Sequence, residues 1–169
     1  MRKGILWASA VLMLASCGPQ PDFHVDISLV DEEHSEDSNS LSETVTIDGY
    51  YGTYYWVYDG YHPDDDFDTD KKYSFLLNDA ELQELTLLIR ENGLMVSREA
   101  TVSTGEPWSA FDLTWNNSME GQSATGHVVG QPISWDDYHQ NGEQMATDES
   151  YYAAAEVMSF VREKVEFEY

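Results

Sequence analysis

Cysteine and basic residues are scarce in this sequence. Its 169 residues include one cysteine, and 8 lysines and arginines stand against 32 aspartates and glutamates, for a formal net charge of -24. A single cysteine excludes an internal disulfide and a zinc centre built from thiolates. So acidic a surface repels phosphates, which excludes nucleic acid as a partner. Hydrophobic residues at 41% and aromatic residues at 13% are too many for a wholly disordered chain.

Common catalytic motifs are also missing. The sequence has no HExxH, P-loop, GxGxxG or GxSxG pattern. Its histidines have no paired metal-ligand spacing: His24, His34, His62, His127 and His139. Acids are so frequent that pairs such as Asp136-Asp137 arise by chance. A hydrolase is therefore the weakest functional hypothesis, and a cavity holding His127 or His139 beside a buried carboxylate would favour it.

The first residues have the pattern of a bacterial secretion signal. Arg2 and Lys3 precede an apolar run that is shorter than the about twenty residues a membrane-spanning helix needs. The run ends in a motif that resembles the lipobox of bacterial lipoproteins, Leu14-Ala15-Ser16-Cys17. The alternative is an uncleaved N-terminal helix with a buried cysteine.

This resemblance implies a lipoprotein of the cell envelope. Cleavage after Ser16 would make Cys17 the new N-terminus, carrying a diacylglyceryl thioether and an acyl chain such as palmitate. Several acyl chains anchor a protein to a membrane durably, whereas one does not. Gly18 stands where an aspartate would retain such a protein in the inner membrane. The resemblance therefore implies the outer membrane of a Gram-negative bacterium.

Composition divides the chain into three parts. Residues 1–16 are the expected signal peptide. Residues 17–43 are mostly polar and acidic, so we expect a lipidated, flexible tether. Residues 44–169 are expected to form a single domain.

Within the expected domain, residue patterns predict strands and two helices. Alternation predicts strands at 44–47, 50–58, 73–77, 96–103, 111–115 and 124–129, with a hairpin turn at Asp48-Gly49. Asn78 and Glu81 form a capping box that starts one helix, which ends at Asn92-Gly93; the other starts at Thr147 or Asp148. This order predicts an α+β fold, an antiparallel sheet of about four to six strands with two helices on one face. It looks like small uncharacterised lipoprotein domains of Gram-negative bacteria, a likeness that implies no activity.

Aromatic residues crowd the second predicted strand. Alternation places Tyr50, Tyr54, Trp56 and Tyr58 on one face, and Tyr51 and Tyr55 on the other. Only one aromatic face can belong to the core, so the other could stack on sugar rings or on a partner protein. We take the candidate stacking residues to be Tyr50, Tyr54, Trp56 and Tyr58. The alternative is that both faces are covered.

The aspartates that follow are candidate calcium ligands. Carboxylates at alternate positions can converge on a calcium ion, here Asp64, Asp66, Asp68 and Asp70. Thr69 and Phe75 occupy the positions where an EF-hand has glycine and glutamate, so the pattern is not an EF-hand. The alternative is a solvated acidic loop.

Three functions remain open. The first is a membrane-anchored, non-catalytic binding module that contacts an envelope protein or glycan and requires no cofactor. The second is a calcium-assisted carbohydrate-binding lipoprotein, and the third is a hydrolase. An acidic composition can also reflect a saline habitat, in which case it implies no partner.

Overall fold

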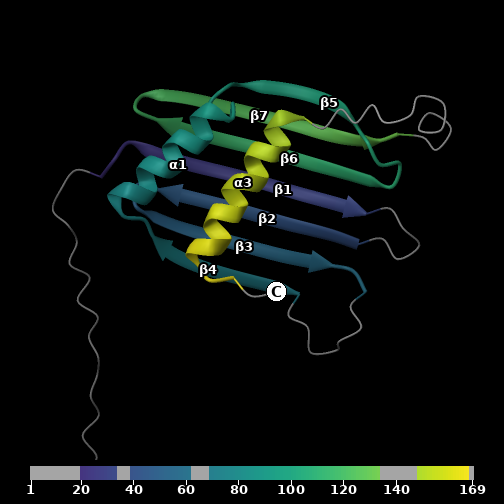
Figure 1. Cartoon of the computed structure of the whole chain (residues 1–169), viewed down its shortest axis with the longest axis horizontal. Coiled ribbons are helices and arrows are strands. Elements are labelled where there is room, and N and C mark those ends of the chain that lie inside the picture. Colours follow the sequence, from purple (N-terminus) through teal and green to yellow (C-terminus); the bar gives the residue numbers. More distant parts are fainter. Residues whose placement is uncertain (1–19, 34–38, 62–68, 134–147, 168–169) are drawn as a thin grey trace, which may run out of the picture.

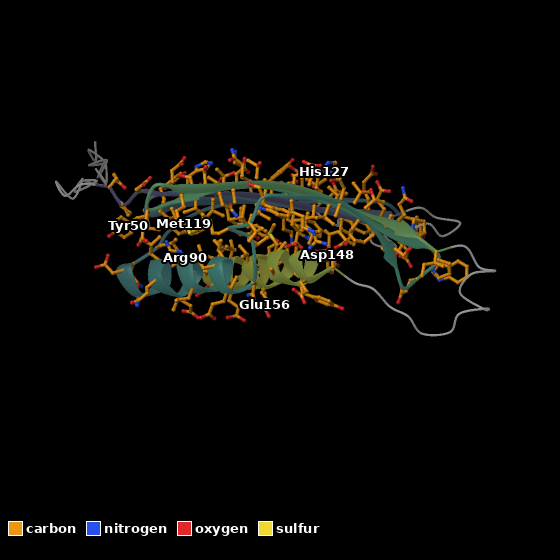
Figure 2. The ribbon with its side chains drawn as sticks, turned by 90° about the horizontal axis from the view of Figure 1, so that it is seen from above. Tyr50, Arg90, Met119, His127, Asp148 and Glu156 are labelled. Atoms are coloured by element: carbon orange, nitrogen blue, oxygen red, sulfur yellow. The ribbon has the colours of Figure 1, made fainter. Side chains whose placement is uncertain are left out.

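The computed structural model describes residues 20–33, 39–61, 69–133 and 148–167. Within these ranges, seven strands form one sheet, and two helices lie together on one of its faces (Figures 1 and 2). The elements are β1 Phe23–Glu33, β2 Asn39–Asp48, β3 Tyr51–Asp59, β4 Asp70–Leu76, α1 Asp79–Glu91, β5 Arg98–Thr104, β6 Ser109–Met119, β7 Gln122–Pro132 and α3 Glu149–Lys164.

The strands lie in the order β4-β3-β2-β1-β6-β7-β5. All neighbours are antiparallel except β5 and β7, which pair in parallel. α1 carries the chain across the sheet from β4 at one edge to β5 at the other (Figure 1). The α+β class is confirmed. The sheet is mixed rather than antiparallel, and it has more strands than the four to six that the sequence predicts.

Most of the extra sheet comes from the segment predicted as a tether. Residues 23–33 form β1 at the centre of the sheet, and 39–43 begin β2. The prediction of a flexible tether over 17–43 and of a fold starting at residue 44 is therefore wrong for these residues. Phe23, Val25, Ile27 and Leu29 alternate with polar residues and are all buried. A strand covered on one face needs only this half of its residues to be apolar.

The two faces of the sheet differ in character. Beneath the helices, Val25, Leu113 and Val128 from the strands pack with Leu85 and Met158 from the helices. The other face carries polar and short side chains. One register row crosses the whole sheet on that face: Lys72, Tyr55, Thr44, Ser28, Thr114, His127 and Glu99. We call this side of the sheet the outer face. No described helix covers the outer face (Figure 2).

Both helices begin where the sequence predicts. The side chain of Asn78 accepts hydrogen bonds from the Ala80 and Glu81 amides, and the Asn78 amide donates one to the Glu81 carboxylate, which confirms the capping box. α1 ends before Gly93, whose φ of 83° is the left-handed conformation that glycine tolerates. Asp148 is the N-cap of α3. Because Arg98 of β5 pairs with the buried Asp148 carboxylate at 2.5 Å, the start of α3 is fixed to the sheet.

Candidate functional site

The predicted stacking residues do not form an accessible platform. Tyr54 and Trp56 are only 0% and 2% exposed, because they lie on the face of β3 that the C-terminal end of α3 and Phe167 cover. Tyr50 belongs to the turn, since Asp48 pairs with Tyr51, and its hydroxyl donates to Asp79 at 2.7 Å.

The exposed aromatics of β3 lie on the opposite side. Tyr51 and Tyr55 are 51% and 41% exposed and belong to the outer face. A stacking role for Tyr54 and Trp56 is thus corrected to a core role. The fourth predicted residue, Tyr58, is half-buried and lines a cleft described below.

The lipidation and calcium predictions fall largely outside the described residues. Cys17 and three of the four aspartates, Asp64, Asp66 and Asp68, lie there. Asp70 is exposed at the start of β4. Within the described ranges, no cluster of three or more histidine, cysteine or acidic residues is placed to hold a metal. Both sites stay predictions.

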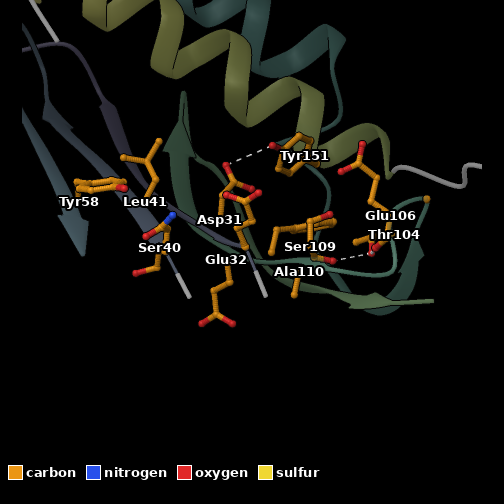
Figure 3. A pocket seen from close by; sticks show the side chains of 14 residues that line it. Asp31, Glu32, Ser40, Leu41, Tyr58, Thr104, Glu106, Ser109, Ala110 and Tyr151 are labelled. Atoms are coloured by element: carbon orange, nitrogen blue, oxygen red, sulfur yellow. Dashed lines mark hydrogen bonds between the residues drawn. The ribbon is translucent and has the colours of Figure 1, made fainter. Parts of the chain in front are cut away.

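A cleft of about 470 Å³ opens where β1 ends, between the sheet and the first turn of α3 (Figure 3). The end of β1 forms its floor with both neighbouring strands, since Asp31 is paired with Leu41 of β2 and with Phe111 of β6. Tyr58 and Leu41 stand on one side, and the β5–β6 connection with Glu106 stands on the other. Tyr151 of α3 closes the cleft from the helix layer.

Asp31 is the central polar group of this cleft. Its strand position matches that of Val25 and Leu29, so it points toward the helices, whereas the adjacent Glu32 points the other way (Figure 3). The Tyr151 hydroxyl donates a hydrogen bond of 3.2 Å to Asp31 Oδ2. Burial raises the pKa of Asp31 above its ordinary value, the Tyr151 bond opposes this rise, and the nearby Glu43 charge adds to it.

Tyr151 is held in its neutral form. Burial, followed by the negative charge of Asp31, raises the pKa of its phenol far above the ordinary value. Its ring lies against Phe111, with 4.8 Å between the ring centres. Tyr151 therefore offers the cleft a fixed hydroxyl and a rigid aromatic surface.

Glu43 lies deeper under α3 and has its own cation. The residue is 4% exposed, and its carboxylate accepts a hydrogen bond from the Tyr54 hydroxyl and pairs with Arg162 Nη1 at 2.7 Å. Burial is the main cause that raises the pKa of Tyr54, so that phenol stays a donor. Of the two neighbouring carboxylates, Glu43 has an ion pair among the described residues, and Asp31 has none there.

The far wall of the cleft is fixed by a buried threonine. Thr104 Oγ1 lies 2.7 Å from the carbonyl oxygen of Ser109, 3.0 Å from that of Gln131 and 3.1 Å from that of Glu106, and it donates to one of them at a time. These contacts connect the end of β5 to the start of β6 and to β7. The wall that carries Glu106 is therefore anchored to three strands.

Neither of the two histidines in the described residues, His24 and His127, lines the cleft. His127 lies on the outer face, with Nε2 3.1 Å from Asp112 and Nδ1 3.8 Å from Glu99 (Figure 2). His139, the other histidine considered for an enzyme, lies outside the described residues. The condition that would favour a hydrolase is thus not met by His127.

Sequence reasoning missed Asp31 and the role of Tyr151. The alternation of residues along β1 could have indicated that Asp31 faces the helices, because Asp31 continues the row of Val25, Ile27 and Leu29. Comparison with models of known protein families gives no match, and comparison with curated protein sequences gives none. In the part of the chain that is described, no helix is both long and apolar enough to cross a membrane.

Proposed function

We propose that this protein is a lipid-anchored, non-catalytic binding module of the cell envelope. We further propose that the cleft around Asp31 is its binding site. The cleft carries the proposal, because a concave site with aromatic walls and a few converging polar groups is the usual form of a ligand site. Its volume of about 470 Å³ is suited to a small molecule or to one or two residues of a peptide.

Binding is favoured over chemistry by the state of the polar groups. Tyr151 keeps its proton because its pKa is raised, so it is a poor nucleophile or base and a good hydrogen-bond donor. Asp31 accepts that bond and is oriented by it. The pair is arranged to hold a ligand.

The test of binding uses a cleft-filling variant. Ser109 lines the cleft from β6, and Thr114 lies on the outer face of the same strand. In a ligand-observed NMR screen of small cationic and neutral fragments, wild type and Thr114→Phe should share a set of hits that Ser109→Phe loses. Matching melting temperatures would show that all three chains are folded. Fragments that bind Ser109→Phe as well as wild type would contradict the proposal.

Anchoring at Cys17 is supported by the lipobox resemblance alone. In cells fed radiolabelled palmitate, the wild-type chain should be labelled and sediment with outer membranes, and Cys17→Ser should lose the label and become soluble. Equal membrane association of the two chains would contradict the lipid anchor. The partner on this proposal is the membrane, together with an envelope protein or glycan that reaches the cleft.

A calcium ion at Asp64, Asp66, Asp68 and Asp70 is a separate proposal, supported by the alternation of carboxylates. A site specific to the folded state would raise the melting temperature as calcium saturates it. No rise, or a rise that sodium chloride reproduces, would refute it. Asp70→Asn should reduce the rise.

A further inference from the structure

The charges around the cleft are all of one sign. Four of its lining residues are acids: Asp31, Glu32, Glu33 and Glu106. The side chain of Glu32 points to the outer face, and the other three surround the cleft. None of the described lining residues is lysine or arginine. Glu33 and Glu106 are exposed at the rim, whereas Asp31 is half-buried inside. An anionic ligand would meet repulsion from Asp31 at the floor and from Glu33 and Glu106 at the rim.

Asp31 has no cation partner among the described residues. Glu43 and Asp31 face the same helix from neighbouring strands, and Glu43 has an ion pair with Arg162. Asp31 receives a single hydrogen bond from a described residue, which Tyr151 donates to Oδ2. A buried charge is costly unless a cation or several donors compensate it, so a cationic group at Asp31 Oδ1 would remove a cost that the free protein carries.

The walls fit the body of an organic cation rather than a bare metal ion. Phe111 and Tyr151 form a tilted aromatic pair on one side, and Tyr58 and Leu41 form the opposite side. Aromatic faces attract ammonium groups and cover apolar carbon. A metal ion would instead need several converging oxygens, and the described residues provide no such cluster.

We infer that the cleft binds an organic ammonium ion, a protonated amine on an apolar body, with the ammonium at Asp31 and the body against Phe111, Tyr151 and Tyr58. This inference rests on the proposed function, since it names the ligand class of the same cleft. The amine of a small molecule and the side chain of a lysine present the same group. Charged hydrogen bonds of this kind contribute more than neutral ones.

The test compares two molecules of nearly equal shape on the full chain in non-ionic detergent. Benzylammonium carries the charge, and benzyl alcohol lacks it. Calorimetric titration at physiological salt, which screens general attraction to the acidic surface, should show one benzylammonium per chain and much weaker binding of benzyl alcohol. Asp31→Asn should weaken benzylammonium binding at least about tenfold, while its amide can still accept the Tyr151 hydrogen bond.

Asp112→Asn is the matched control, because it removes the same charge from an exposed position on the outer face. It should change the affinity less than about twofold, as expected for a screened charge. Equal weakening by both variants would overturn the inference in favour of unspecific attraction. Equal affinities for the alcohol and the amine, both lost in Ser109→Phe, would overturn the ammonium ligand and leave the binding cleft standing. Binding of either compound that Ser109→Phe does not affect would overturn both.

Discussion

Removing Arg162 should destabilise the fold far more than removing a comparable cation nearby. Arg162→Met leaves Glu43, a residue that is 4% exposed, with the Tyr54 hydroxyl and without a cation partner among the described residues. Breaking a buried ion pair from one side costs about 3–5 kcal/mol, which in a chain of this size lowers the melting temperature by about 6–20 °C. Urea unfolding followed by circular dichroism measures the free energy directly.

Lys164→Met is the matched control on the same helix. Lys164 pairs with Glu81 at 2.6 Å, but both side chains are about a quarter exposed, so its loss should cost about 1 kcal/mol or less. Adding Glu43→Gln to Arg162→Met should recover part of the lost stability, because no buried charge is then left behind. The reasoning is refuted if Arg162→Met costs no more than Lys164→Met, or if Glu43→Gln gives no recovery.

Three further outcomes are expected. Because burial raises the pKa of Asp31 above 3.8, ionisation of this carboxyl lowers the stability of the fold as the pH rises. Asp31→Asn should therefore have a higher melting temperature than wild type at neutral pH, and the two melting temperatures should be equal below pH 3.8. Gly126→Ala should cost about 1–3 kcal/mol in urea unfolding, because its methyl group would overlap the Trp115 ring. The Lys164 bond lowers the pKa of Glu81 below 4.5, so the melting difference between wild type and Lys164→Met should persist above pH 4.5 and shrink below it.

The helices could be predicted because their signals are local. The capping box of Asn78 and Glu81 and the stop at Gly93 each depend on a few neighbouring residues, and all of them are in place. The core side of α3 follows the same local logic, because its buried apolar residues recur at helical spacing: Ala153, Ala154, Val157, Met158 and Val161.

The cleft could not be predicted because its floor lies in the segment assigned to the tether. Composition averaged over 17–43 is mostly polar and acidic, and this average hides the alternation of Phe23, Val25, Ile27 and Leu29. For the same reason, Asp31 was assigned to the tether and not to the folded domain. Its pairing with Leu41 and Phe111 joins residues that are distant along the chain, and no local pattern specifies such pairs.

Placing β1 in the sheet also changes how the proposed anchor would present the cleft. From Cys17 to Phe23 the chain spans six residues, which reach at most about 20–22 Å when fully extended. A lipid on Cys17 would therefore hold the fold close to the membrane, where the predicted tether would have let it move further away. Phe23 and Asp31 lie at opposite ends of β1, about 27 Å apart at strand spacing. The cleft, which contains Asp31, thus lies at the end of β1 remote from the point where the chain enters the sheet. If Cys17 carries the proposed lipid, a ligand would reach the cleft without passing the lipid surface.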